Sequence, residues 1–349
     1  MASWAEMKWL TGQVRSHAPG HTFIQSFTDR EQSYVYDQAL AIIAFTRDGD
    51  YQQARALIKT LEKFQLEDGT WYFSYYFDGR SPHPEEGDMR PHGAVAWAAM
   101  ALLTYEKESG DRSFRKVWYK TLEHLERNIV EVPRLEKRAL RFAAVDNKKT
   151  AWNEREVVAL EHALDGIAAF RMAHHLTKEK RWKTHQKHLE DFALALWDEA
   201  EGHFWSGASV ATGKINRGEF YLDNQSWSAL ALSHLPLKDK LRSALMASCR
   251  LEIERGPLKG FSESRSPASE QNFIWSEGTA GKALALELQQ VSCAKTAPRR
   301  YIATLESMKH QGGVRYVDSP DVVDFSHAPS VAGTVWTWFL RHKINPFDL

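Results

Sequence analysis

The sequence predicts an all-α protein built from helical hairpins, and three observations support this fold class. Helical periodicity recurs along the 349 residues, with hardly any of the alternating apolar and polar runs that are typical of strands. A weak internal repeat joins helices through a charged turn that ends in an aromatic residue, as at Tyr51, Phe114 and Trp182. A second kind of connection, Gly followed by aromatic residues, recurs in EDGTWYF, AEGHFWSG, LKGFSES and QGGVRYV. The first kind fits the turn inside a hairpin, and the second fits the longer loop between hairpins.

Taken in order, these signals divide the chain into six pairs of helices. The first helices of the pairs are expected to begin near Tyr34, Pro91, Asn153, Asp223, Phe273 and Ser330. The second helices are expected near Tyr51, Arg112, Trp182, Lys238 and Ala294, and the N-terminal residues 4–14 are expected to supply the sixth. Residues 127–150 fit no helix pair, and their second half is expected to be a loop near the opening of the fold.

The two kinds of helix differ in composition. The first helices are rich in Ala, Trp and small residues, as in AVAWAAMALL and SVAGTVWTWF, whereas second helices such as YQQARALIKTLEKFQ are amphipathic with one charged side. An inner ring of buried helices wrapped by an outer ring of amphipathic helices satisfies this pattern. Because no Pro/Gly/Ser-rich or charged linker interrupts it, we expect a single domain over residues 1–349.

The third inner helix carries the most informative polar residues. Residues 152–170, WNEREVVALEHALDGIAAF, are apolar on nearly every side, yet Glu161 and Asp165 lie one turn apart in the middle. Two like charges removed from water are costly, so they need either a basic partner, a helix N-terminus or a role in chemistry.

Composition excludes several classes of function. Lys plus Arg and Asp plus Glu are both 45, and no basic stripe suggests a nucleic-acid or membrane-surface partner. The longest apolar run, residues 94–103, is too short to span a bilayer, and MASWAEMKWL does not resemble a signal peptide. The compartment stays open between the cytoplasm and, if a leader was removed, the periplasm or exterior. Cys249 and Cys293 have no CxxC or zinc-like spacing, so no metal or other cofactor is indicated, although one bridge between them remains open.

Several segments together resemble the bacterial six-hairpin glycosidase superfamily: YVYDQALAIIAF, HGAVAWAAMALLTY, EHALDGIAAF, LWDEAEGHFWSG, LDNQSWSALAL, WSEGTAGKALAL, GGVRY and a terminal NPF. This resemblance runs over almost the entire chain and implies an (α/α)6 barrel, or toroid. It also implies a glycan-cleaving, usually inverting enzyme whose cleft lies where the first helices begin. A carbohydrate substrate is then the expected partner, and a monomer is favoured. The same toroid also serves sugar epimerases, polysaccharide lyases and glycoside phosphorylases, so the fold does not fix the reaction.

In such a toroid the starts of all six inner helices face one cleft, which selects the candidate catalytic acids. An inverting hydrolase needs one protonated carboxyl and one ionised carboxylate. Glu161, in its apolar helix, suits the general acid, and Asp37 and Asp223, near helix starts, suit the base. Glu277, in WSEGT, competes for either role. The alternative for each is an acid that only complements a helix N-terminus.

Aromatic, amide and charged residues near the same opening are candidates for binding sugar rings and hydroxyl groups. These candidates are Tyr36, Gln38, Trp71, Tyr75, Arg90, His92, Trp152, His162, Asp165, Gln225, Trp227, Trp275 and His327.

Three other functions remain open. A sugar 2-epimerase would use paired His residues as acid and base, and His92, His162 and His327 could lie at the opening. A lyase would favour a cluster of Asn, His, Tyr and Arg over paired acids. A catalytically inactive toroid could bind glycans without cleaving them.

Overall fold

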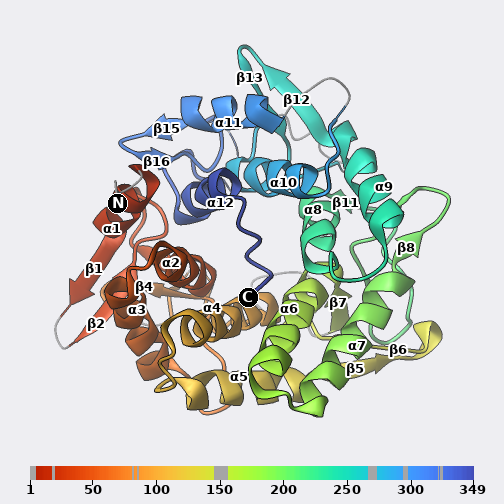
Figure 1. The fold of residues 1–349 in the computed structure, drawn as a ribbon, viewed down its shortest axis with the longest axis horizontal. Helices are drawn as coiled ribbons and strands as arrows, with labels where there is room; N and C mark the ends of the chain where they lie inside the picture. The colour runs from red at the N-terminus through yellow and green to blue at the C-terminus, as the bar shows by residue number, and fades with distance from the viewer. Residues whose placement is uncertain are drawn as a thin grey trace.

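The computed structural model describes residues 5–17, 20–80, 82–84, 86–144, 156–265, 273–293, 298–320, 322 and 325–349. Its helices form two concentric rings, which confirms the predicted (α/α)6 toroid (Figure 1). The inner ring consists of α2 (Val35–Asp48), α4 (His92–Ser109), α6 (Leu160–Thr177), α8 (Leu222–Ala231), α10 (Ser276–Leu288) and α12 (Val331–His342). The outer ring consists of α3 (Tyr51–Phe64), α5 (Arg115–Arg127), α7 (Lys180–Ala195), α9 (Lys238–Ser248), α11 (Pro298–Ser307) and α1 (Ala5–Gln13). The N-terminal helix α1 packs on α12 and so closes the ring.

Burial explains why the two rings differ in composition. Outer helices bury one side only: in α3 this side consists of Ala54, Leu57, Ile58 and Leu61, which recur at helical spacing. Inner helices are covered on every side; in α4 every residue from 92 to 106 is buried. Small residues and Trp are therefore concentrated where helices must pack closely on both flanks.

Short β-ladders join the loops at one end of the toroid. The sequence indicated hardly any strands, but the described residues include eight two-stranded antiparallel ladders. Their strands have two to four residues, too few for alternation to be recognised. The ladders pair β1 (Val14–His17) with β2 (His21–Ile24), β3 (Gln32–Tyr34) with β4 (Ser74–Tyr76), β5 (Ile129–Val132) with β6 (Lys137–Leu140), β7 (Val157–Ala159) with β10 (Gly207–Ser209), β8 (Trp197–Asp198) with β9 (His203–Phe204), β11 (Phe220–Tyr221) with β14 (Ser264–Arg265), β12 (Glu252–Arg255) with β13 (Leu258–Phe261), and β15 (Lys309–His310) with β16 (Gly313–Val314).

One backbone hydrogen bond recurs at the start of every inner helix. The first residue of each helix donates its N–H to a carbonyl in the loop of a neighbouring hairpin. The pairs are Val35 with Phe73 (3.0 Å), His92 with Phe142 (2.8 Å), Leu160 with Ser206 (2.8 Å), Leu222 with Glu263 (2.8 Å), Ser276 with Tyr316 (2.9 Å) and Val331 with Ser26 (2.9 Å). These bonds satisfy a donor that a helix start leaves free, and they fix one loop residue beside each helix start. We call this end of the toroid the cleft end.

The third inner helix differs from its predicted start. It begins at Leu160 and not near Asn153, because residues 157–159 are extended as β7 and pair with β10. The unassigned residues 127–150 contain the β5–β6 hairpin with the 3-10 turn η1 (Pro133–Leu135), while residues 145–150 lie outside the described residues.

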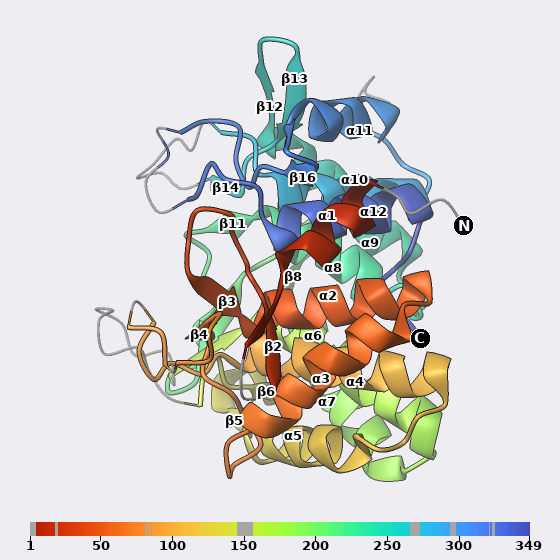
Figure 2. The ribbon, with the colours of Figure 1, turned by 90° about the vertical axis from the view of Figure 1, so that its left-hand side faces the viewer.

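The opposite end of the toroid is crossed by the C-terminal residues 343–349, and we call it the closed end (Figures 1 and 2). Figure 2 shows the ladders β3–β4 and β11–β14 at one end and the C-terminus at the other. Cys249 and Cys293 form a disulfide with a Cα–Cα distance of 5.5 Å, which answers the question that their spacing left open. Among the described residues, no helix combines the length and apolar character needed to cross a bilayer.

Candidate active site

A cleft of about 970 Å³ opens at the cleft end, beside the starts of α6 and α8. Its acidic side chains are Glu161, Glu219, Asp223 and Glu263, and its wall also contains the rings of Phe142 and Tyr221. The remaining lining comes mainly from residues 206–219 and from Val157, Ala159 and Asn224. The cleft thus combines several carboxyl groups with aromatic and polar side chains.

The acids of the cleft end occupy equivalent positions in consecutive inner helices. Glu161, Asp223 and Glu277 are each the second residue of their helix, in α6, α8 and α10. Because the inner helices are related by the ring, equivalent positions point toward the same region. Tyr36 holds this position in α2, and its hydroxyl donates a hydrogen bond to the Glu277 carboxylate across the ring.

Burial and neighbouring negative charges keep these three acids protonated to unusually high pH. Burial raises the pKa of Glu161 well above its ordinary value, and the charges of Asp223, Glu277 and Glu263 raise it further. Burial, followed by the charge of Glu263, raises the pKa of Asp223 to about 7. Burial raises the pKa of Glu277 to about 8, although the Tyr36 hydrogen bond opposes this change. In the part of the chain that the structure describes, no Lys or Arg forms an ion pair with any of the three.

Asp165 lies one turn below Glu161 and is fully buried. Burial raises the pKa of its carboxyl, and the charge of Glu161 adds to this effect. The Trp97 indole is near enough to lower the pKa of Asp165, but the two groups do not complete a hydrogen bond. No described residue forms a hydrogen bond with either carboxyl oxygen of Asp165. The pair noticed in the sequence is therefore a pair of acids without a cation, and not half of an ion-pair network.

Asp37 is placed differently from the other predicted catalytic acids. It is the third residue of α2, so it points about 100° away from the direction of Tyr36. Burial raises its pKa to about 7, opposed by hydrogen bonds with Ser26 and with the Ala332 backbone. Asp37 is 3% exposed and does not line the cleft. Its charge does, however, raise the pKa of Glu277.

Glu263 was not among the predicted site residues. It belongs to the loop LKGFSES, and its carbonyl accepts the hydrogen bond from Leu222, which holds it beside Asp223. The signal that could have revealed it is its position two residues after a buried residue, Phe261, in a Gly-aromatic loop. The same spacing relates Trp71 to Phe73, Phe204 to Ser206 and Val314 to Tyr316, whose carbonyls also meet helix starts.

The structure corrects the prediction for both glutamines. Gln38 accepts a hydrogen bond from the Ile24 N–H (2.8 Å), and Gln225 accepts one from the Phe204 N–H (3.0 Å). Both are the fourth residue of an inner helix, where Thr279 and Thr334 make the same kind of bond to the N–H groups of Phe261 and Val314. Gln38 and Gln225 therefore hold loop backbone in the interior and do not line the cleft.

Other predicted binding residues also lie away from the cleft. Trp71 and Tyr75 are 1% exposed, and the Trp71 indole donates to the Leu61 carbonyl (2.7 Å). Arg90 pairs with Asp68 (2.6 Å). Gly-containing polar sequence predicts loops correctly, but these loops are packed against the outer ring, so their aromatic residues are core.

Two of the tryptophans that were predicted to bind sugar are buried. Trp227 stacks on Trp336 with ring centroids 5.7 Å apart, and Trp275 packs edge-on against Tyr316 at 6.5 Å. Both are 5% exposed and neither lines the cleft. Trp152 lies outside the described residues.

The predicted histidines do not line the cleft either. His92 is fully buried between the Arg141 carbonyl (2.6 Å) and the His124 ring (3.1 Å), and burial lowers its pKa to about 3. His162 contacts the Phe142 carbonyl (2.9 Å) under the Phe142 ring, and burial lowers its pKa to about 4. His327 contacts the Val317 carbonyl (3.0 Å). Both buried rings are thus neutral at physiological pH.

Comparisons with known proteins identify the fold. No protein-family model matches the chain, and no curated protein matches its sequence. Its structure is similar to a sugar epimerase from a ruminal bacterium, with a TM-score of 0.74 and 12% identity over 97% of this chain and 96% of that chain. It is also similar to cellobiose 2-epimerase from Spirochaeta thermophila, with a TM-score of 0.72 and 14% identity over 98% and 93% of the two chains. Endoglucanase Cel10, a family 8 glycosyl hydrolase from Klebsiella pneumoniae, gives a TM-score of 0.62 and 13% identity over 97% and 99%.

These similarities define a class of fold. The chain has an (α/α)6 toroid like that of these solved structures, which confirms the fold that its sequence segments indicated. Both hydrolases and epimerases share this toroid, and identities of this size establish the fold alone.

Proposed function

We propose that the protein is an inverting glycoside hydrolase that acts on an oligo- or polysaccharide. The observation that carries this proposal is the presence of Glu161 and Asp223 together in one open cleft, each at the start of its inner helix. Paired carboxyl groups on either side of a bond are the groups that glycoside hydrolysis requires. The Phe142 and Tyr221 rings in the same cleft suit the apolar faces of sugar rings.

The proposed mechanism assigns the two roles by environment. Glu161 has its pKa raised well above the ordinary value, so it keeps a proton that it can donate to the glycosidic oxygen as the C–O bond breaks. Asp223 is ionised above about pH 7, where it takes a proton from the water that attacks the anomeric carbon. After one turnover Glu161 is ionised and Asp223 protonated, and exchange with solvent restores both. Activity should therefore rise through about pH 7 and fall again where Glu161 loses its proton.

A sugar 2-epimerase is the second candidate, because the similar structures include a sugar epimerase and a cellobiose 2-epimerase. Proton transfer at C2 needs basic groups that reach the sugar. No His lines the cleft within the described residues, and His92 and His162 use one ring nitrogen each on a backbone carbonyl. The cleft therefore supports hydrolysis better than epimerisation.

One experiment separates the two reactions. The protein is incubated with β-glucan, chitin-type and mannan oligosaccharides and with cellobiose, and proton NMR follows the anomeric signals during the first minutes. The proposal expects shorter products that appear first with the anomeric configuration opposite to that of the cleaved bond. Conversion of the reducing-end sugar to its C2 epimer without cleavage would identify the epimerase. Initial retention of configuration would contradict the inverting mechanism.

A further inference from the structure

The residues under the acids form an aromatic layer across the ring axis. We call it the aromatic floor: Tyr36, Trp97, Trp227, Trp336 and Phe347. Trp97 is central, with ring centroids 5.3 Å from Tyr36, 5.9 Å from Trp227, 6.1 Å from Trp336 and 5.2 Å from Phe347. Four of these rings come from inner helices, whereas Phe347 comes from the C-terminal residues that cross the closed end (Figure 1).

The upper side of the aromatic floor contacts two of the acids. The Trp97 indole lies beside Asp165, and the Tyr36 hydroxyl donates to Glu277 while it accepts a hydrogen bond from Trp336 Nε1 (2.7 Å). The lower side is completed by Phe347, which is fully buried and also contacts Trp227 at 5.8 Å. The aromatic floor is therefore the layer between the acids and the closed end.

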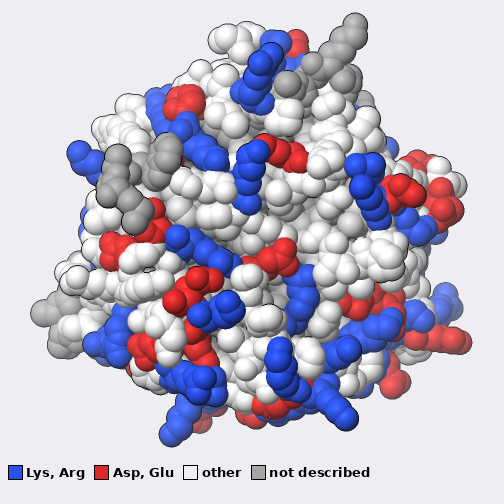
Figure 3. All heavy atoms as spheres, viewed as in Figure 1, with Lys and Arg blue, Asp and Glu red and all other residues white. Residues whose placement is uncertain are grey.

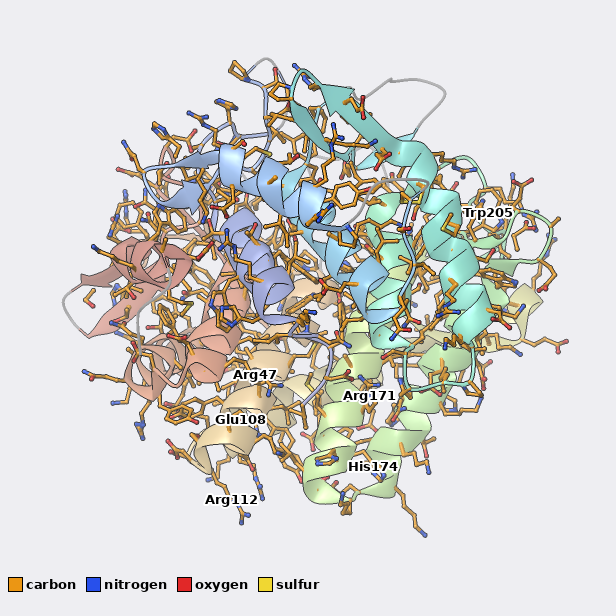
Figure 4. The ribbon with its side chains drawn as sticks, turned by 45° about the horizontal axis from the view of Figure 1, so that its top comes forward. Arg47, Glu108, Arg112, Arg171, His174 and Trp205 are labelled. Atoms are coloured by element: carbon orange, nitrogen blue, oxygen red, sulfur yellow. A yellow bond between two sulfur atoms is a disulfide. The ribbon has the colours of Figure 1, made fainter. Side chains whose placement is uncertain are left out.

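The C-terminal residues are tied to the ends of the inner helices. Arg47 of α2 donates to the Asp348 carbonyl (2.8 Å) and to Glu108 of α4 (2.8 Å), and Arg171 of α6 donates to the Phe347 carbonyl (2.8 Å). Figure 4 shows Arg47, Glu108 and Arg171 gathered at this end of the helices. Asn345 donates to the Leu230 carbonyl of α8 (3.1 Å), and Lys343 pairs with Glu287 of α10 (2.5 Å). Four inner helices, α2, α6, α8 and α10, thus hold the segment that carries Phe347.

We infer that residues 343–349 seal the active-site cavity from the closed end, and that Phe347 is a positioning residue that keeps Trp97 against Asp165 and keeps water from the acids above it. This inference rests on the proposed function, since it assigns the seal a role in proton donation by Glu161. A phenyl ring in this place excludes water, and exclusion of water is the main cause of the raised pKa values of Asp165 and Glu161.

The charged groups near Asp165 determine what loss of the seal would change. The buried groups above the aromatic floor are acids or neutral side chains, although the exposed Lys214 and Arg217 also line the cleft, whereas the groups below the aromatic floor are paired charges. Above it are Glu161 and His162 of α6, Asp223 of α8, Glu277 of α10, Asp37 of α2 and His92 of α4; below it are Arg47, Glu108, Arg171, Glu287, Lys343 and Asp348. Water admitted through the aromatic floor would solvate the ionised form of the acids, and this lowers their pKa values.

The test compares Phe347→Ala with Phe347→Leu, which retains apolar volume, and with Phe192→Ala, a fully buried ring of outer helix α7. The kcat for oligosaccharide cleavage is measured from pH 5 to 10 for each variant. We expect the alkaline limb, which reports loss of the Glu161 proton, to move down by about one pH unit in Phe347→Ala and by less in Phe347→Leu. Phe192→Ala should lose comparable stability with no shift of the limb. A limb that is unchanged in a folded Phe347→Ala, or displaced equally in Phe192→Ala, would overturn the inference.

A second measurement does not depend on hydrolysis. Acids with raised pKa values destabilise the fold as pH rises from about 4 to about 8. Urea unfolding across this window should give a flatter decline for Phe347→Ala and Phe347→Leu than for the wild type and Phe192→Ala. If the wild type cleaves no glycan, the proposed function fails while this measurement still decides whether the seal exists. Parallel declines in all four proteins would contradict the seal.

Discussion

Two buried glutamates at opposite ends of the toroid differ in their ion pairing and in the direction of their pKa shifts. Glu6 of α1 and Glu277 of α10 are 1% and 4% exposed. Glu6 pairs with Lys309 (2.6 Å) and Arg341 (3.2 Å), and although burial raises its pKa, these partners leave the pKa below the ordinary value. Glu277 has hydrogen bonds from tyrosine hydroxyls but no cation, and its pKa rises to about 8. At similar burial, the cationic partners keep the Glu6 carboxyl ionised, whereas the Glu277 carboxyl, without a cation, stays protonated to about pH 8.

The same contrast extends to the two ends as a whole. At the closed end, basic and acidic side chains are interspersed over the surface (Figure 3), and Arg171 pairs with Asp348 as Lys343 pairs with Glu287. At the cleft end, Glu161 and Asp223 are unpaired among the described residues, with only a helix N-terminus in their favour. A helix N-terminus stabilises an acid by roughly 0.3–1 kcal/mol, too little to offset burial beside other acids. An arrangement that reduces stability at one end only is typical of an active site.

The largest expected effect comes from neutralising an acid at the cleft end, with an acid at the closed end neutralised as the control. We expect Glu161→Gln to lower kcat by roughly 10²–10⁴-fold, because Gln cannot donate a proton to the leaving oxygen. The same substitution should raise the midpoint of thermal unfolding at pH 8, since folding at this pH requires Glu161 to take up a proton that its carboxyl lacks in the unfolded chain, and Gln avoids this cost. Reducing-end assays and thermal melts measure both.

The matched control is Glu108→Gln at the closed end, where the ion pair with Arg47 is partly exposed. Its activity should stay within about twofold of wild type and its stability within about 1 kcal/mol. Near-normal turnover by a folded Glu161→Gln protein would remove Glu161 from the mechanism.

The next effect, on stability, has opposite signs for the two buried glutamates. Glu277 has a pKa raised from 4.5 to about 8, so its contribution to stability is greatest below about pH 4.5 and is lost as pH rises through about 8. Glu6 has a lowered pKa, so its contribution is present above pH 4.5 and is lost as pH falls. At pH 9 we expect Glu277→Gln to stabilise the fold and Glu6→Gln to destabilise it, each by on the order of 2 kcal/mol in urea unfolding. Stabilisation by Glu6→Gln would mean that the pairing at Glu6 does not matter, and destabilisation by Glu277→Gln would mean that the lack of a cation at Glu277 does not matter.

The ring and the acids of its inner helices could be predicted because both depend on helical periodicity. Apolar residues all around 160–177 and one-sided patterns in 51–64 separate inner from outer helices, and polar residues at inner-helix starts then stand out. Which residue of a first helical turn faces the ring axis depends on how each helix is oriented within the toroid. Tyr36 and Asp37 are adjacent and equally plausible in sequence, yet Tyr36 faces Glu277 while Asp37 faces Ser26.

The loops of the site could not be predicted, because their positions depend on contacts between hairpins. Glu263 reaches the cleft through a backbone bond from Leu222, 41 residues earlier in the chain, and only the two-residue spacing that its loop shares with other loops indicates that pairing. Phe73 holds the equivalent position in another Gly-aromatic loop, and its carbonyl meets the start of α2, but its side chain does not line the cleft. Composition alone gives both loops the same appearance.

The smallest expected effect tests whether Glu263 belongs to the site, by comparing two equivalent threonines. Thr279 accepts a hydrogen bond from the Phe261 N–H (3.0 Å), and Thr334 accepts one from the Val314 N–H (2.9 Å). Either Thr→Val substitution leaves one buried N–H unsatisfied, so each should cost about 1–3 kcal/mol of stability. Only Thr279 supports the loop that carries Glu263 into the cleft, so Thr279→Val should lower kcat/KM by about tenfold and Thr334→Val by less. Thermal melts establish that the two variants are equally destabilised, and steady-state kinetics then separates them. Equal losses of kcat/KM at equal stability would mean that the loop of Glu263 contributes no more to the reaction than the loop of Val314 does.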